Sequence, residues 1–135
     1  MNKELNEAIK KAKGKSDFVV MVSKLMHSDL RAQVFHRGTK SYAEHIALGT
    51  YYDEIVDLVD KIVESYQGKN GLIGNYHNYE LENYENSQQV IKYFEKLVDD
   101  VENLRKDMVE SYIQNQIDGI RSEEHTSELQ SRQYL

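Results

Sequence analysis

Hydrophobic residues recur every three or four positions through most of the chain, which is the spacing of an amphipathic α-helix. The first such stretch is expected to start at a capping residue, Ser16 or Asp17, and to run to about Arg37, because Gly38 follows as a stop signal. The positions expected to face a core are Phe18, Val22, Leu25, Met26 and Phe35.

A second helix is expected from Tyr42 to about Gln67. Ser41 and Glu44 have the spacing of a capping box, in which each side chain hydrogen-bonds the backbone N–H of the other residue. The hydrophobic stripe of this helix contains Leu48, Tyr52, Ile55, Val56, Val59, Ile62, Val63 and Tyr66.

A long connection follows, rich in Gly and then in Tyr, and it has room for one short helix. A third helix is expected to begin near Ser87, with Val90, Phe94, Leu97, Val98, Val101 and Leu104 facing inward. A second capping box, Ser111 and Gln114, predicts the start of a fourth helix that contains Ile113, Ile117 and Ile120. Two hairpins joined by one long crossover predict an all-α fold, a four-helix bundle of the ferritin-like kind.

Composition agrees with one helical domain. The 135 residues include no Pro and no Cys, which removes disulfides and thiolate metal sites, and 30% of the residues are charged. The net charge of −6 gives no general attraction to nucleic acid. No apolar run approaches the roughly 20 residues of a membrane helix. We expect a cytoplasmic protein without a membrane partner.

The two ends of the chain differ from its middle. Residues 1–15 form a basic N-terminal arm with five lysines and two glutamates, and residues 16–120 form the bundle. The arm is expected to be a short helix or a frayed segment that Gly14 ends. The arm offers weak candidates for DNA contacts, which solubility explains equally well; they are Lys10, Lys11, Lys13 and Lys15. The segment RSEEHTSELQS within residues 121–135 resembles the translated product of a common sequencing adapter, so we treat these residues as an artefactual tail that truncates the fourth helix.

Two of the five histidines lie on either side of the predicted break at Gly38. On one unbroken helix His36 and His45, nine residues apart, would point to opposite sides. A break lets them converge as nitrogen ligands of a metal ion. The second helix also carries four acidic residues at helical spacing, which are Asp53, Asp57, Asp60 and Glu64. Oxygen ligands with imidazole suit iron, manganese or zinc, whereas a solvated helix face is the simpler interpretation.

The distance between the histidines and the acidic residues along the second helix determines whether they could bind the same ion. Fifteen residues separate His45 from Asp60, which is about 22 Å along a helix axis. One chain cannot bring both to one ion. Two copies packed antiparallel across a two-fold axis could place His45 of one copy near Asp60 of the other. The Glu-x-x-His motif of an intra-bundle di-iron site is absent.

The segment FHRGTKSYAEHIALGTYYDEIVDLVDKIVE, residues 35–64, resembles the signature of Dps-type mini-ferritins, the DNA-protection proteins of starved cells. The resemblance implies that His36 and His45 bind iron together with Asp60 and Glu64 of a neighbouring subunit. It further implies a ferroxidase that oxidises Fe(II) with peroxide or oxygen, at a mono-iron or di-iron site, and stores the product as mineral inside a hollow oligomer, a dodecamer built from dimers. Asp29, Asp57 and Tyr52 are candidates for a supporting shell around the ligands.

Three departures from the family pattern stand in the same segment. The two histidines are closer together than is usual, Arg37 replaces a Trp, and Gly49 stands where a carboxylate often follows the second histidine. They favour a separate branch of small ferritin-like proteins, with a phage origin (and the host cytoplasm as location) as one option. They also keep an alternative open, a metal-free helical interaction or structural protein whose ferritin-like site has degenerated.

Overall fold

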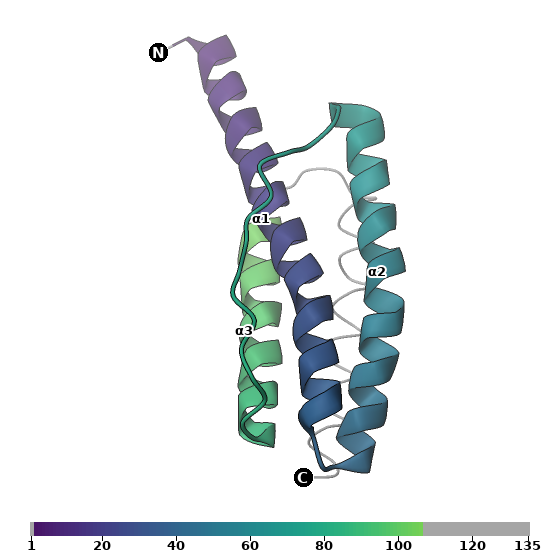
Figure 1. Ribbon diagram of the computed structural model, residues 1–135. Helices are drawn as coiled ribbons and strands as arrows, with labels where there is room; N and C mark the ends of the chain where they lie inside the picture. Colours follow the sequence, from purple (N-terminus) through teal and green to yellow (C-terminus); the bar gives the residue numbers. More distant parts are fainter. Residues whose placement is uncertain (1, 107–135) are drawn as a thin grey trace.

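The computed structural model describes residues 2–106, which fold into three helices and contain no β-strand. The helices are α1 (Lys3–Gly38), α2 (Tyr42–Asn70) and α3 (Ser87–Arg105). Helix α1 packs against both α2 and α3, and the connection between α2 and α3 runs back along the bundle, so that α2 and α3 point the same way (Figure 1). The all-α class and the long crossover are confirmed. The predicted fourth helix and the tail at 121–135 lie outside the described residues.

Helix α1 differs from the prediction because it does not break near Gly14. It is one continuous helix from Lys3, capped by the side chain of Asn2, which accepts a hydrogen bond from the Glu4 N–H at 2.7 Å. A single Gly costs a helix only about 1 kcal/mol relative to Ala. Strong helix formers on both sides of Gly14 outweigh that cost. Residues 2–13 are exposed, and the first turns of α1 project past the other helices (Figure 1).

The corner between α1 and α2 contains only half of the predicted capping box. Ser41 Oγ accepts the Glu44 N–H at 3.2 Å, as expected, but the Ser41 N–H donates to Thr39 Oγ1 at 3.1 Å. Thr39 thus takes the partner that Glu44 would have used. The Glu44 side chain is fully buried, and within the described residues neither of its carboxylate oxygens has a hydrogen-bond partner.

Gly38 ends α1, as predicted, and the crossover explains why this position has no side chain. A Cβ atom at residue 38 would lie 2.5 Å from the Cβ of Tyr84, which is too close for any side chain. Tyr84 also packs edge-on against Phe35, with ring centroids 6.4 Å apart. The glycine therefore allows the end of the crossover to lie directly on the end of α1.

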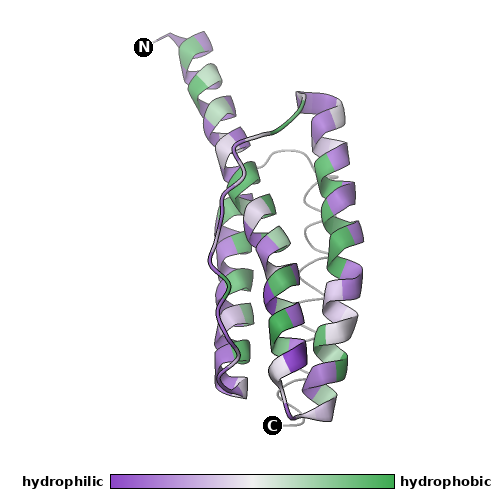
Figure 2. Cartoon of the chain, in the orientation of Figure 1, coloured by the Kyte–Doolittle hydropathy of each residue, from purple (hydrophilic) through white to green (hydrophobic). Residues whose placement is uncertain are grey.

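The crossover, residues 71–86, is extended and contains no short helix. Three contacts attach its first half to the bundle: the side chain of Ile73 is buried, the Ile73 N–H donates to Gln67 Oε1 at 3.0 Å, and the His77 N–H donates to Ser23 Oγ at 2.9 Å. Hydrophobic residues recur along all three helices, whereas the crossover is mostly hydrophilic (Figure 2). It lies along the surface of the bundle and contributes little to the core.

Aromatic rings connect the three helices. Phe18 of α1 stacks on Tyr66 of α2 at 3.9 Å between centroids, and Tyr51 of α2 meets Phe94 of α3 edge-on at 4.9 Å. The buried Tyr51 hydroxyl shares a hydrogen bond with Ser28 Oγ at 2.7 Å, which satisfies both polar groups inside the core. No helix in this part of the chain has an apolar stretch long enough to cross a membrane.

Two residues that the hydrophobic pattern placed in the core are half exposed. Met26 of α1 keeps 50% of its surface and Val56 of α2 keeps 45%, and Leu30 beside them keeps 47%. All three line a groove of about 350 Å³ between α1 and α2, which we call the α1–α2 strip. The core prediction is wrong at Met26 and Val56, because helical spacing identifies an apolar face but not what covers it.

Candidate functional site

The break at Gly38 brings His36 and His45 together. Their rings stack with centroids 3.6 Å apart and planes inclined by 17°. One ring comes from the last turn of α1 and the other from the first turn of α2. The predicted convergence of the two histidines is confirmed.

Hydrogen bonds to Nδ1 orient both rings. His36 Nδ1 lies 2.6 Å from the His45 carbonyl oxygen, and His45 Nδ1 lies 2.8 Å from the His36 carbonyl oxygen. A carbonyl oxygen only accepts, so each Nδ1 carries the hydrogen and donates it. In the neutral ring the lone pair is then on Nε2. Each histidine is oriented in the way that metal-binding histidines usually are, with Nε2 as the ligand atom.

Gly49 explains one of the departures from the mini-ferritin pattern. A Cβ atom at this position would lie 3.1 Å from Cε1 and 3.3 Å from Nδ1 of His36. The His36 ring therefore occupies the space that a longer side chain would need. Tyr52, one turn further on, meets the same ring edge-on at 5.3 Å. A carboxylate at residue 49 and the stacked histidine pair exclude each other.

The stack restricts how the two rings can bind metal. A lone pair on Nε2 lies in the plane of its ring, and a metal–nitrogen bond is about 2.0–2.1 Å long. Two nearly parallel planes with centroids 3.6 Å apart cannot both contain one ion at that distance. One ion per ring is compatible with the stack, because two-metal sites have ions about 3.5–4 Å apart.

The predicted carboxylates do not join the histidines within one chain. Asp60 and Glu64 are exposed on α2, and Asp60 lines the groove of the α1–α2 strip. Fifteen residues of continuous helix keep Asp60 about 22 Å from His45 along the axis. No three His, Asp or Glu residues within 2–106 gather where they could hold an ion. A site shared between two chains stays a prediction.

The three supporting residues have different surroundings. Tyr52 contacts His36, as described above. Asp29 instead accepts a hydrogen bond from Gln33 Nε2 at 3.1 Å, and Asp57 is exposed. Of the three, Tyr52 is the residue with a ring contact to a predicted ligand.

The candidate DNA-binding lysines lie on the exposed first half of α1, where Lys13 pairs with Asp17 at 3.4 Å. The other three are Lys10, Lys11 and Lys15, and their side chains are exposed as well.

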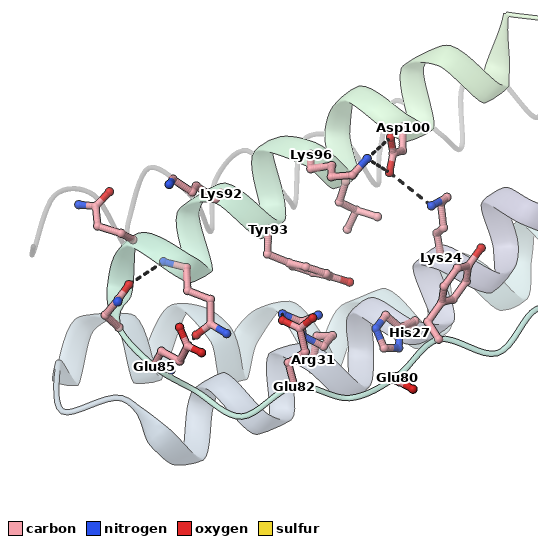
Figure 3. Close-up of a pocket in the computed structure, with 15 residues that line it drawn as sticks. Lys24, His27, Arg31, Glu80, Glu82, Glu85, Lys92, Tyr93, Lys96 and Asp100 are labelled. Atoms are coloured by element: carbon pink, nitrogen blue, oxygen red, sulfur yellow. Dashed lines mark hydrogen bonds and ion pairs between the residues drawn. The ribbon is translucent and has the colours of Figure 1, made fainter.

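A larger cavity, of about 710 Å³, was not anticipated from the sequence. It lies between α1, the crossover and α3, and Figure 3 shows Arg31 in its wall beside Glu82 and under Tyr93. Arg31 is only 6% exposed, and its guanidinium lies 4.9 Å from the Phe35 ring and 4.4 Å from the Tyr93 ring. The one available signal was the position of Arg31, a turn before Phe35 on the core-facing side of the helix.

His27 shares this cavity with Arg31. Burial lowers the pKa of His27 below its usual value, and the positive charge of Arg31 lowers it further. The carboxylate of Glu82 acts in the opposite direction, and Lys24 adds to the lowering. The ring packs between Tyr79, at 5.4 Å, and Tyr93, at 6.4 Å. A perturbed pKa beside a buried guanidinium makes this cavity a second candidate site.

Comparison with known proteins gives one match. No curated protein and no solved structure matches the chain significantly. A family model described as a family of unknown function, DUF5856, matches residues 36–130, a span that includes all four predicted ligands. Because this match covers more than half of the sequence, the chain belongs to the DUF5856 family.

Proposed function

We propose that two copies of the chain form a site that binds and oxidises ferrous iron, with His36 and His45 from one copy and Asp60 and Glu64 from the other. The stacked histidines carry this proposal. Both use Nδ1 to hold their orientation and leave Nε2 for a ligand. They stand at the end of the hairpin, where the missing side chain of Gly49 makes space for the His36 ring. The fold we propose is ferritin-like, with a fourth helix that follows residue 106.

The α1–α2 strip supports an antiparallel partner. Met26, Leu30 and Val56 expose apolar surface along α1 and α2, and a monomer gains by covering such a surface. Asp60 lies at the strip, and the histidines lie nearer the other end of α2. A second copy related by a two-fold axis covers the strip and brings its own acidic residues toward the histidines.

The chemistry suits these ligands. Imidazole nitrogen and carboxylate oxygen bind Fe(II), and the negative charge of the carboxylates favours Fe(III) over Fe(II). With hydrogen peroxide as the oxidant, each of two ferrous ions gives up one electron. The oxygen–oxygen bond breaks, and two protons from water complete the two water molecules that leave. The ring spacing of 3.6 Å in the histidine stack agrees with two ions bound side by side. By resemblance, the ferric product is stored inside an oligomeric shell, a dodecamer, that protects DNA from oxidation.

A mixing experiment tests whether the site is shared. His45→Ala and Asp60→Ala are each loaded with Fe(II) without oxygen, then given peroxide, and Fe(III) absorbance is followed. Each variant alone is expected to be inactive. An equal mixture, allowed to exchange subunits, should recover about a quarter of the native rate, because half of the dimers are mixed and each mixed dimer has one complete site.

Asp53→Ala is the matched control, since Asp53 is an exposed carboxylate on the same helix outside the predicted ligand set. It should keep the native rate. Equal rates in the native protein and both ligand variants would exclude this site. Two inactive variants that gain nothing on mixing would show a site contained in one chain.

A metal-free role is the second candidate, and the histidine geometry also favours it. Each ring donates to the other residue's backbone carbonyl, so the pair closes the α1–α2 corner without an ion. An interaction protein with this fold would show the same unfolding temperature with and without Fe(II) under anaerobic conditions. A clear rise on adding Fe(II), abolished in His45→Ala, would exclude it.

A further inference from the structure

We propose that the cavity around Arg31 binds a small organic anion, a carboxylate or phosphate monoester attached to a flat ring, which replaces Glu82 against Arg31. This site is separate from the histidine pair and does not depend on the iron proposal. Its three walls are α1, the crossover and α3 (Figure 3).

Arg31 has the properties of an anion-binding residue. Its guanidinium is a rigid fork of five N–H donors that matches the oxygens of a carboxylate or phosphate. The rings of Phe35 and Tyr93 hold it in place. Only one acceptor reaches it, Glu82 Oε2 at 3.5 Å from Nη2, and its buried Nε has no partner within the described residues. Most of its donors are therefore available to a ligand.

Glu82 occupies the position of the ligand only loosely. Its distance of 3.5 Å from Arg31 exceeds the roughly 2.7–2.9 Å of a strong charge-assisted hydrogen bond. Its side chain is 65% exposed and belongs to the extended crossover. An anion with better geometry can displace it into water at little cost.

The rest of the cavity determines the size and charge of the ligand. The rings of His27, Tyr79 and Tyr93 offer flat apolar surface to an aromatic body. The volume of about 710 Å³ is typical of small-molecule sites. Four acidic residues also line it, which disfavours polyanions such as nucleoside triphosphates; they are Glu80, Glu82, Glu85 and Asp100. A ligand with one anionic group fits best.

Lys92 is the most suitable second cation. Lys24 and Lys96 both pair with Asp100, at 3.4 Å and 3.0 Å, and are neutralised by it (Figure 3). Lys92 lines the same cavity on α3 and forms no ion pair with another described residue. Its charge therefore adds to the positive potential of the cavity wall.

Calorimetric titration of the whole chain tests the site with four probes. Benzoate and phenyl phosphate each carry both an aromatic ring and an anionic group. Benzyl alcohol carries only the ring, and inorganic phosphate carries only the anionic group. We expect saturable binding of the two ring anions and much weaker binding of the other two. The stronger of the two ring anions identifies carboxylate or phosphate as the natural group.

Substitutions then assign the anion to Arg31. Glu82→Gln removes the competing carboxylate and should tighten binding several-fold, while Arg31→Lys and Lys92→Gln should weaken it, by about tenfold or more for Arg31. Glu54→Gln, the same change at an exposed position on α2, should leave affinity unchanged.

If Arg31→Lys fails to fold, Glu82→Gln still tests the proposal, because the Glu82 side chain is exposed and its replacement should not disturb the fold. Unchanged affinity in Glu82→Gln, equal binding of benzyl alcohol and benzoate, or no binding of any probe would overturn the proposal.

Discussion

The surroundings of His27 disfavour the protonated form of its ring. Burial and the positive charges of Arg31 and Lys24 lower the pKa of its imidazole below 6.5, and the Glu82 carboxylate only partly offsets them. The uncharged Tyr79 and Tyr93 face the ring from the crossover and α3. In the unfolded chain none of these neighbours acts on the ring, so the unfolded state binds a proton more readily.

This difference predicts that acid destabilises the fold through His27. Between the lowered folded pKa and the unfolded value of 6.5, the unfolded state holds more protons, so the free energy of unfolding falls as pH falls. The contribution is fully present above 6.5 and is lost on the way down to the folded pKa. In His27→Gln this loss should disappear. Urea midpoints at neutral pH and below 6.5 measure it; an equal acid-induced decrease in both proteins would contradict the prediction.

Some residues of the two candidate sites could be identified from the sequence, and others could not. His36 and His45 were identifiable because a Gly and a capping Ser stand between them, and both signals act within a few residues. Arg31 was not, because its role depends on Tyr93 and Glu82, which are more than fifty residues away in sequence. The significance of Gly49 likewise required the His36 ring above it.

At the scale of elements, α1 is the helix whose prediction failed most clearly. The Gly14 break was inferred from a local stop signal, but the residues on both sides favour a helix strongly enough to continue through it. The arm is therefore a helical extension of α1. Helical geometry also divides its lysines: Lys10 and Lys13 share one side, while Lys11 and Lys15 share another.

Lysines divided in this way predict weak, sequence-independent DNA binding. Replacing all four lysines with Gln should abolish a gel shift that is seen at low salt. In the native protein only one pair of lysines can face the DNA at once, so the slope of log affinity against log salt concentration should correspond to about two phosphate contacts. A control with four other exposed lysines changed to Gln (Lys40, Lys61, Lys69 and Lys106) should keep the shift. A shift that survives in the arm variant, or none in the native protein, would contradict this.

At the scale of the whole molecule, the α1–α2 strip is the exposed apolar surface on which the proposed dimer depends. Within the described residues, Met26, Leu30 and Val56 keep about half of their surface exposed in this groove, which residues 77–79 of the crossover also line. Aromatic contacts in the core beneath join α1 to α2 and α2 to α3. The strip is thus available for association without any change in the fold.

A charge in the strip should separate the proposed dimer. Leu30→Glu places a carboxylate at the two-fold interface but leaves the monomer intact, since Leu30 is already 47% exposed. Sedimentation analysis should show a dimer or larger assembly for the native protein and a monomer for the variant, with equal helix content by circular dichroism. Leu81→Glu, at an exposed crossover leucine, should remain assembled. A native monomer, or a variant that stays associated, would exclude this interface.

The sequence alone determined the helical class, the starts of α2 and α3 and the break at Gly38; α2 ends at Asn70, three residues after the predicted Gln67. Hydrophobic period, caps and stop signals are interactions within a few residues, so they can be read along the chain. The tertiary structure decided which apolar residues remain uncovered, how the two histidines stack, and that Arg31 lines a cavity. Each of these depends on segments distant in sequence being packed within a few ångströms of one another, which local pattern does not specify.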